Sequence, residues 1–113
     1  MVIDGNVIEI GTLNQLKSGT SVLTIKVLHR AYNPTARQFT GQVVYDVELR
    51  KHLADNAYAS LAIGDDVLID ADEHDLAASI YTDSHGQAHP LLNGAKARNI
   101  GLSIRSEPLP HDA

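Results

Sequence analysis

The strongest constraint on the fold is a period of two in the apolar residues of two stretches, Val22–His29 and Val43–Leu49. Successive side chains of a β-strand point to opposite sides of its sheet, so this period places apolar residues on one face. In the first stretch that face holds Leu23, Ile25 and Val27. In the second it holds Val43, Tyr45, Val47 and Leu49, so Tyr45 is expected to pack in the core. Both stretches are therefore predicted to be strands with one buried face.

Three further segments are also predicted to be strands. Asn6–Ile10 alternates between polar and apolar residues near the start of the chain. Val67–Ala71 reads as a strand that can continue to Ala77, and a second arm returns over Ala88–Ile100. The polar segment Tyr81–Gln87 between these arms contains a glycine that suits a turn, so it is predicted to be the tip of a long hairpin.

One segment has a different period. Apolar residues recur at a spacing of four within Leu53–Ile63, which predicts a short amphipathic helix. Gly64 follows where a C-terminal cap glycine is common. Lys17-Ser18-Gly19 is predicted to be a turn, and a polar loop is expected from Asn33 to about Gly41.

The predicted order is three strands, one short helix and two strands joined by a long hairpin. This is the order of an OB-fold, an all-β five-stranded Greek-key barrel with one short helix and a long hairpin between its fourth and fifth strands. We expect residues 1–105 to form this domain and residues 106–113, which include Pro108 and Pro110, to form a short flexible C-terminal tail. Barrels of this kind bind oligonucleotides, sugars or proteins, so the fold alone does not give the function.

The charge of the chain is unevenly distributed. The 113 residues carry a formal net charge of −5 and no cysteine, which excludes a disulfide, a thiolate zinc site and a cysteine nucleophile. Residues 1–51 contain six basic and four acidic groups, whereas residues 52–113 contain three basic and ten acidic groups. Six of those ten lie between Asp65 and Asp75. A cationic face can therefore coexist with an acidic total, although the total itself argues against nucleic-acid binding.

Several motifs, in order along residues 5–105, resemble those of the bacterial-type single-stranded DNA-binding proteins. They are Gly5-Asn6-Val7, Ser18–Val22, Val44–Arg50, Leu53–Ala57, Ser60–Ile69, Tyr81–Gln87 and Asn99–Arg105. The resemblance implies an OB-fold that coats single-stranded DNA without sequence specificity during replication, recombination or repair. It also implies a homo-oligomer, a tetramer or alternatively a dimer, in a bacterial cytoplasm or nucleoid or in a phage-infected host. No membrane partner is expected, because the chain has neither a signal-peptide pattern nor a sufficiently long apolar run.

The residues expected to bind the strand combine cations for phosphates with aromatic faces for bases. They are Lys26, Arg30, Tyr32, Arg37, Phe39, Arg50, Lys51 and Tyr81. Tyr81 stands where the resembled family usually has a stacking aromatic. Tyr32 and Phe39 have an alternative role as loop anchors folded onto the core, and Tyr58 is assigned to packing or to an interface.

Three departures from the family pattern predict weaker, salt-sensitive binding. Val44 and Arg50 stand where the third strand usually carries stacking aromatics, and Glu48 adds negative charge to the same face. The long tail with an acidic end, through which relatives recruit replication and repair proteins, has no counterpart in these 113 residues. These departures are typical of a divergent paralogue or a phage-encoded member.

Two other classes of function compete with this interpretation. The first is an OB-fold module that binds proteins and has lost most of its affinity for DNA. The second is a metal-dependent enzyme, because Asp70, Asp72 and His74 share one strand parity. Alternate strand residues lie about 7 Å apart, which is loose for a metal site, so an acidic solvated edge is the preferred interpretation. His85 and His89 are expected to be exposed polar residues, and no catalytic residues, cofactor or metal are predicted.

Overall fold

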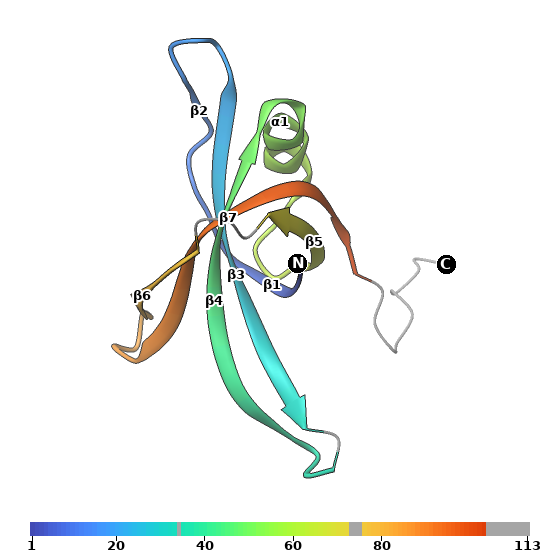
Figure 1. Ribbon diagram of the computed structural model, residues 1–113, viewed down its shortest axis with the longest axis vertical. Helices are drawn as coiled ribbons and strands as arrows, with labels where there is room; N and C mark the ends of the chain where they lie inside the picture. The colour runs from blue at the N-terminus through green and yellow to red at the C-terminus, as the bar shows by residue number, and fades with distance from the viewer. Residues whose placement is uncertain (34, 73–75, 104–113) are drawn as a thin grey trace.

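The computed structural model describes residues 1–33, 35–72 and 76–103, apart from the side chains of residues 31–33, 39 and 40. Most of this chain is strand (Figure 1). The elements are β1 (Val2–Ile10), β2 (Asn14–Gln15), β3 (Ser21–Asn33), β4 (Gln38–Arg50), α1 (Lys51–Ser60), β5 (Asp66–Asp72), β6 (Ala77–Thr82) and β7 (Ala88–Leu102).

Five of these strands close into a barrel. The order in the sheet is β1-β5-β7-β4-β3, and β3 pairs back with β1. The β4–β7 pair is parallel, whereas the other four pairs of the barrel are antiparallel. This closed arrangement is the expected OB-fold. Two further strands in the described residues were not expected: β2 pairs with β3, and β6 pairs with the first half of β7.

The core lies inside the barrel, as the period of two predicts. Leu23, Ile25 and Val27 of β3 are at most 1% exposed, and Val47 and Leu49 of β4 are fully buried. Tyr45 is partly buried and packs against this core, as expected. The helix α1 covers the barrel with Ala54 and Ala57, whose small side chains allow a close approach. Apolar burial of this kind is the main stabilising contribution to the fold.

The helix is shorter at its end than its sequence pattern predicts. It ends at Ser60, and Leu61 is already extended, because the Leu61 side chain packs against the core. Gly64 is therefore not the helix cap. It lies in a following turn with a φ of 97°, and its N–H donates to the carbonyl of Val7 over 2.7 Å. The helix begins at Lys51, whose φ of 59° makes an abrupt corner after β4.

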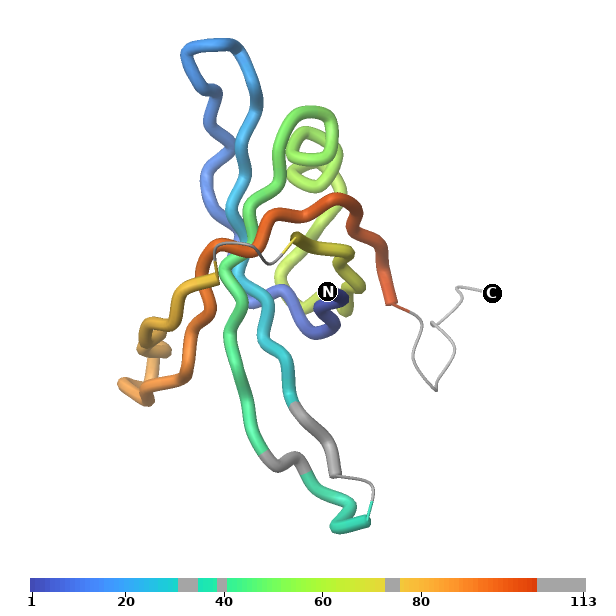
Figure 2. Tube along the Cα trace, viewed as in Figure 1, coloured from blue at the N-terminus to red at the C-terminus, as the bar shows by residue number. Residues whose placement is uncertain are grey.

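Three hairpin ends project from the barrel (Figure 2). The turn at Lys17–Gly19 precedes β3 as predicted. The expected loop from Asn33 to Gly41 is instead mostly strand, because β3 runs to Asn33 and β4 already begins at Gln38. The third hairpin joins β6 to β7. In the described ranges, no helix is both long and apolar enough to cross a bilayer.

Candidate nucleic-acid interface

A groove of about 530 Å³ lies between the outer face of β3 and β4 and the β6–β7 hairpin. We call it the hairpin groove, and its lining residues are Ile8, Leu28, Arg30, Gln42, Val44, Tyr81, Asp83, Ser84, Gln87 and His89. The register explains how they meet. Leu28 pairs with Val44 and Arg30 pairs with Gln42 across β3 and β4, while Tyr81 pairs with His89 across the hairpin. The groove therefore brings together two predicted site residues, Arg30 and Tyr81.

The floor of the groove is apolar and closely packed. Val44 points to the outer face of β4, yet it is fully buried because the parallel strand β7 places Leu91 beside it. Leu91 is itself only 8% exposed. Val44 and Leu91 thus fasten the hairpin to the barrel, outside the main core. Val44 therefore has a structural role here and offers no ring for base stacking.

The wall of the groove is organised by Asp83. One carboxylate oxygen of Asp83 accepts hydrogen bonds from the N–H groups of His85 and Gln87, both over 2.9 Å. The other lies 2.8 Å from Nε2 of His89. The hydrogen bond with His89, followed by that from Gln87, lowers the pKa of Asp83 below its ordinary value.

The His89 ring in turn lies against Tyr81, with centroids 6.4 Å apart and planes tilted by 31°. Only 17% of the His89 side chain is exposed. The expectation that His89 is an exposed polar residue is therefore wrong, whereas His85 is exposed. His89 was missed because its role depends on the pairing of the two arms around the turn. The two arms pair symmetrically about His85, one residue before the turn glycine, and this register places His89 opposite Tyr81.

Lys26 is held between two carboxylates near the groove. Its ammonium lies 2.8 Å from Oε2 of Glu9 and 3.9 Å from Oδ1 of Asp46. The hydrogen bond to Glu9 raises the pKa of Lys26, and the charges of Asp46, Glu9 and Tyr81 raise it further against the effect of burial. Burial also raises the pKa of Asp46, whose Oδ1 has no hydrogen-bond partner among the described residues. The cation at Lys26 is thus neutralised by acids of this same chain.

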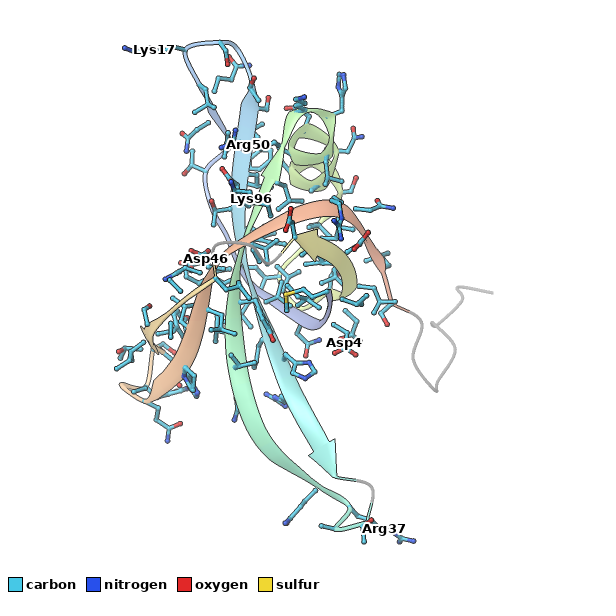
Figure 3. All side chains as sticks on the ribbon, viewed as in Figure 1. Asp4, Lys17, Arg37, Asp46, Arg50 and Lys96 are labelled. Atoms are coloured by element: carbon cyan, nitrogen blue, oxygen red, sulfur yellow. The ribbon has the colours of Figure 1, made fainter. Side chains whose placement is uncertain are left out.

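The remaining predicted cations lie outside the hairpin groove (Figure 3). Arg50 donates to Oε1 of Glu48 through Nε and Nη2, over 3.1 and 3.0 Å. Arg37 lies at the tip of the β3–β4 hairpin with a φ of 52°, at the end of the molecule opposite Lys17. Lys51 lines a different pocket at the start of α1. The cations are therefore spread along the molecule rather than gathered in one stripe.

The side chains of two predicted aromatics, Tyr32 and Phe39, lie outside the part of the chain that the structure describes. Their backbones pair with each other near the tip of the β3–β4 hairpin. Their contact with bases and their alternative role as loop anchors both stay predictions.

The residues of the alternative metal site are used differently. Asp70 accepts a hydrogen bond from Arg98 over 3.0 Å, which lowers the pKa of the Asp70 carboxyl. His74 lies outside the described residues. Within the ranges that the structure describes, no group of three or more His, Asp or Glu side chains is arranged to hold a metal ion.

Comparison with known proteins supports the fold. The structure is similar to the crystal structure of the small single-stranded DNA-binding protein from Streptomyces coelicolor, with a TM-score of 0.63 and 24% sequence identity. The match covers 92% of this chain and 93% of that one. No protein-family model and no curated protein matches the sequence. The chain thus has the fold of a single-stranded DNA-binding protein over nearly its whole length.

Proposed function

We propose that this protein binds single-stranded DNA without sequence specificity, as a binding protein rather than an enzyme, and that the hairpin groove is its main binding site. The observation that carries the proposal is the meeting of Arg30 and Tyr81 in one groove with an apolar floor. A cation beside an aromatic face is the pairing that a phosphate and a neighbouring base require. The similarity to a small single-stranded DNA-binding protein supports the same function.

In this proposal a base stacks on Tyr81 while Arg30 contacts an adjacent phosphate. Leu28 and Ile8 make apolar contacts, and the amides of Gln42 and Gln87 both donate and accept hydrogen bonds. Stacking is tolerant of sequence because every base has a π-face. The strand would then continue toward the cations outside the groove, Arg37, Arg50 and Lys51. Protection of single strands in replication, recombination or repair is the role that such binding fits.

We also propose that the protein is a homo-oligomer, a tetramer or a dimer. Val2 and Leu68 are 71% and 45% exposed on the outer face of β1 and β5, and both line a shallow pocket beside Gly101. Exposed apolar residues that lie together commonly mark an interface. Leu68→Glu should therefore dissociate the oligomer, and light scattering coupled to gel filtration measures this. An unchanged mass would refute this choice of interface.

Fluorescence anisotropy of a labelled oligo-dT at low salt tests the proposed binding of single-stranded DNA in the hairpin groove. Tyr81→Ala should weaken binding by about 1–3 kcal/mol, or roughly 5- to 150-fold in Kd, because it removes one stacking face. Tyr81→Phe is the matched control, since it keeps the ring and should bind nearly as well as the unmodified protein. Absence of saturable binding at micromolar protein, or equal losses in both variants, would contradict the proposal.

A protein-binding module is the second candidate function. The observation that favours it is the pairing of Lys26 and Arg50 with Glu9 and Glu48, which leaves less positive charge for phosphates. The same titration separates the candidates. An interaction module would bind a protein partner in a pull-down and show no strand binding even at low salt.

A further inference from the structure

The strand β6 lies at an edge of the sheet (Figure 1). It pairs with β7 along its whole length, and no described residue pairs with its other side. Asp83 donates its N–H to the carbonyl of Gln87 over 2.9 Å, and successive pairs of an antiparallel ladder alternate between bonded and unbonded. The N–H and C=O groups of Ala78, Ile80 and Thr82 therefore point away from β7. We call this row of backbone groups the β6 edge.

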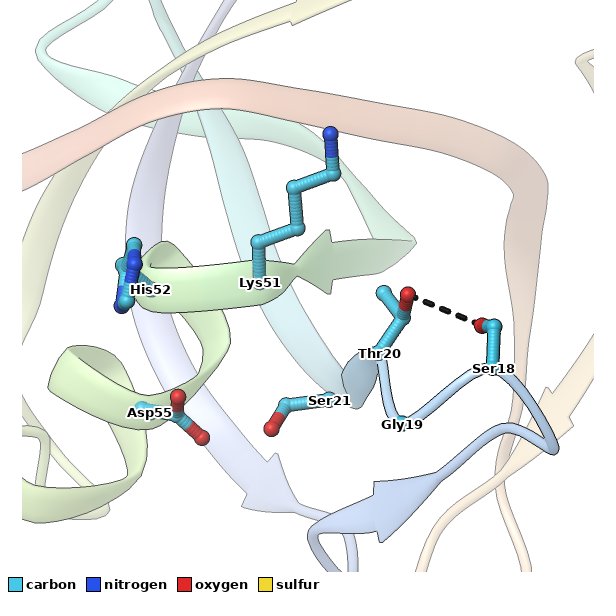
Figure 4. Close-up of a pocket in the computed structure, with 7 residues that line it drawn as sticks. All are labelled: Ser18, Gly19, Thr20, Ser21, Lys51, His52 and Asp55. Carbon is cyan, nitrogen blue, oxygen red and sulfur yellow. Dashed lines mark hydrogen bonds between the residues drawn. The ribbon is translucent and has the colours of Figure 1, made fainter.

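The sequence of β6 does not protect this edge. Natural proteins block exposed edges with charged residues, proline, bulges or very short strands. The segment Ala77–Thr82 contains no charged residue, no proline and no glycine, and its pairing with β7 has no bulge. By contrast, the outer strand β2 consists only of Asn14 and Gln15. The turn after β2 is polar, with the hydroxyl oxygens of Ser18 and Thr20 3.0 Å apart (Figure 4).

The back face of the hairpin, opposite the face that carries Tyr81, has no charge. It consists of Ala78, Ile80 and Thr82 and their partners on β7, which are Leu92, Pro90 and Ala88. The side chain of Ile80 is 71% exposed, although isoleucine is among the residues most often buried. An occupant of the β6 edge must therefore have an extended backbone, to meet the outward N–H and C=O groups, and an uncharged apolar face.

From these features we infer that β6 pairs with β6 of a second copy of this chain, antiparallel and about a two-fold axis at Ile80. The strand itself has both properties that the edge requires, and a two-fold contact uses the same surface on both partners. Ile80 then lies opposite Ile80 of the second copy, and Ala78 lies opposite its Thr82. Each of these pairs exchanges backbone hydrogen bonds, and no like charges meet across the edge.

The pairing also joins two hairpin grooves, a consequence that rests on the proposed binding of single-stranded DNA. Residues opposite each other in an antiparallel pair lie on the same side of the sheet, so Tyr81 of both copies lies on one face. A strand that leaves one groove can then enter the next. Copies bound to one strand are held at a high effective concentration, which favours their pairing. The β6 edge therefore makes binding along a strand cooperative.

Hydrogen exchange of individual amides, followed by NMR, tests the pairing directly. In the unmodified protein the outward N–H groups of Ala78, Ile80 and Thr82 should exchange as slowly as the inward N–H groups of Ser79 and Tyr81. In Ile80→Lys, which places a charge on the edge, the outward groups should exchange fast and the inward groups should stay slow. Fast exchange of the outward groups in the unmodified protein would overturn the pairing.

Ile63→Lys is the matched control for Ile80→Lys. Ile63 is 69% exposed in the turn after α1, so its substitution adds the same charge at a similarly exposed site away from the edge. Light scattering coupled to gel filtration should give a lower mass for Ile80→Lys and an unchanged mass for Ile63→Lys. Ile80→Pro should also lower the mass, because it removes one outward N–H and no bond to β7. Equal masses for Ile80→Lys and the unmodified protein would contradict the inference.

Titrations with oligo-dT separate this inference from the proposed function. The unmodified protein should bind a long oligo-dT cooperatively, whereas Ile80→Lys should bind it without cooperativity even though it adds a cation. Absence of oligo-dT binding by the unmodified protein would refute the proposed function alone, because the exchange and mass measurements contain no DNA. Normal binding of oligo-dT by an unmodified protein with fast-exchanging outward amides would refute the β6 edge alone.

Discussion

Replacing Glu9 by Gln is predicted to strengthen the binding of single-stranded DNA. Glu9 holds the Lys26 ammonium at 2.8 Å, and Asp46 lies 3.9 Å from the same ammonium. The three side chains together carry a charge of −1 next to strands that form the hairpin groove. Glu9→Gln removes the closer carboxylate and keeps a side chain of the same shape, so Lys26 becomes available to a phosphate.

The size of the effect has two parts. A carboxylate about 7 Å from a phosphate repels it by about 0.6 kcal/mol in water, so the removal of this repulsion strengthens binding about threefold at low salt. The half-exposed position of Glu9 justifies the dielectric constant of water. One additional phosphate contact by Lys26 would steepen the dependence of log K on log salt by about 0.7 for a single strand. Between 50 and 200 mM salt, the variant should therefore lose about 2.6-fold more affinity than the unmodified protein.

Anisotropy titrations of oligo-dT at several salt concentrations measure both quantities. Asp70→Asn is the matched control, because it also removes one carboxylate and releases one cation, Arg98, but on β5 and β7 rather than beside the groove. Only Glu9→Gln should show the steeper salt dependence. Unchanged or weaker binding by Glu9→Gln, or equal gains in both variants, would refute the placement of the strand near Lys26.

Four further predictions concern stability and the hairpin. Burial raises the pKa of Asp46, so its ionised form opposes folding at neutral pH. Asp46→Asn should therefore slightly raise the Tm at pH 7. The difference in Tm between this variant and the unmodified protein should shrink at lower pH, as acid protonates Asp46 in the folded protein. Asp83→Ala removes negative charge from the groove yet should weaken oligo-dT binding severalfold in anisotropy titrations, because the wall beside Tyr81 loses the carboxylate that organises it. Because the pKa of Asp83 is lowered in the fold, its carboxylate contributes fully to stability near neutral pH. This contribution is lost as the pH falls below about 4. Acid unfolding of the unmodified protein and of Asp83→Asn measures the loss. Lys51→Gly should stabilise the fold by about 1 kcal/mol, or about 4 °C in Tm by calorimetry, because glycine adopts the left-handed φ without the cost that a side chain brings.

The barrel could be predicted because its strands have one buried face each. Leu23, Ile25 and Val27 alternate with residues that tolerate water, and such a pattern fixes which side of a strand enters the core. The end of the helix could not be predicted in the same way. The spacing of Leu53, Ala57 and Leu61 continues the helical period, but the packing of Leu61 against the barrel core is a tertiary contact and ends the helix early.

Part of the hairpin groove could also be predicted from the sequence. Arg30 follows from residue type and strand parity, and Tyr81 follows from the resemblance of its hairpin to that of the single-stranded DNA-binding proteins. The structure places both in the lining of one groove. The burial of Val44 could not be foreseen, because it depends on the parallel pairing of β4 with β7, two strands separated by the helix and two other strands. Pairing partners that are distant in sequence leave no periodic signal in either strand.

The ion pair between Lys26 and Glu9 depends on one irregularity in β1. Val7 pairs with Val27, but the register shifts before Glu9, which then pairs with Lys26 instead of Ile25. Such a β-bulge inserts one extra residue into one strand and redirects the side chains that follow. In a regular pair Glu9 would lie opposite Ile25, and Lys26 would face one acid fewer. The charge that this surface offers to a nucleic acid is therefore set less by the number of basic residues than by the register that decides which carboxylate each of them meets.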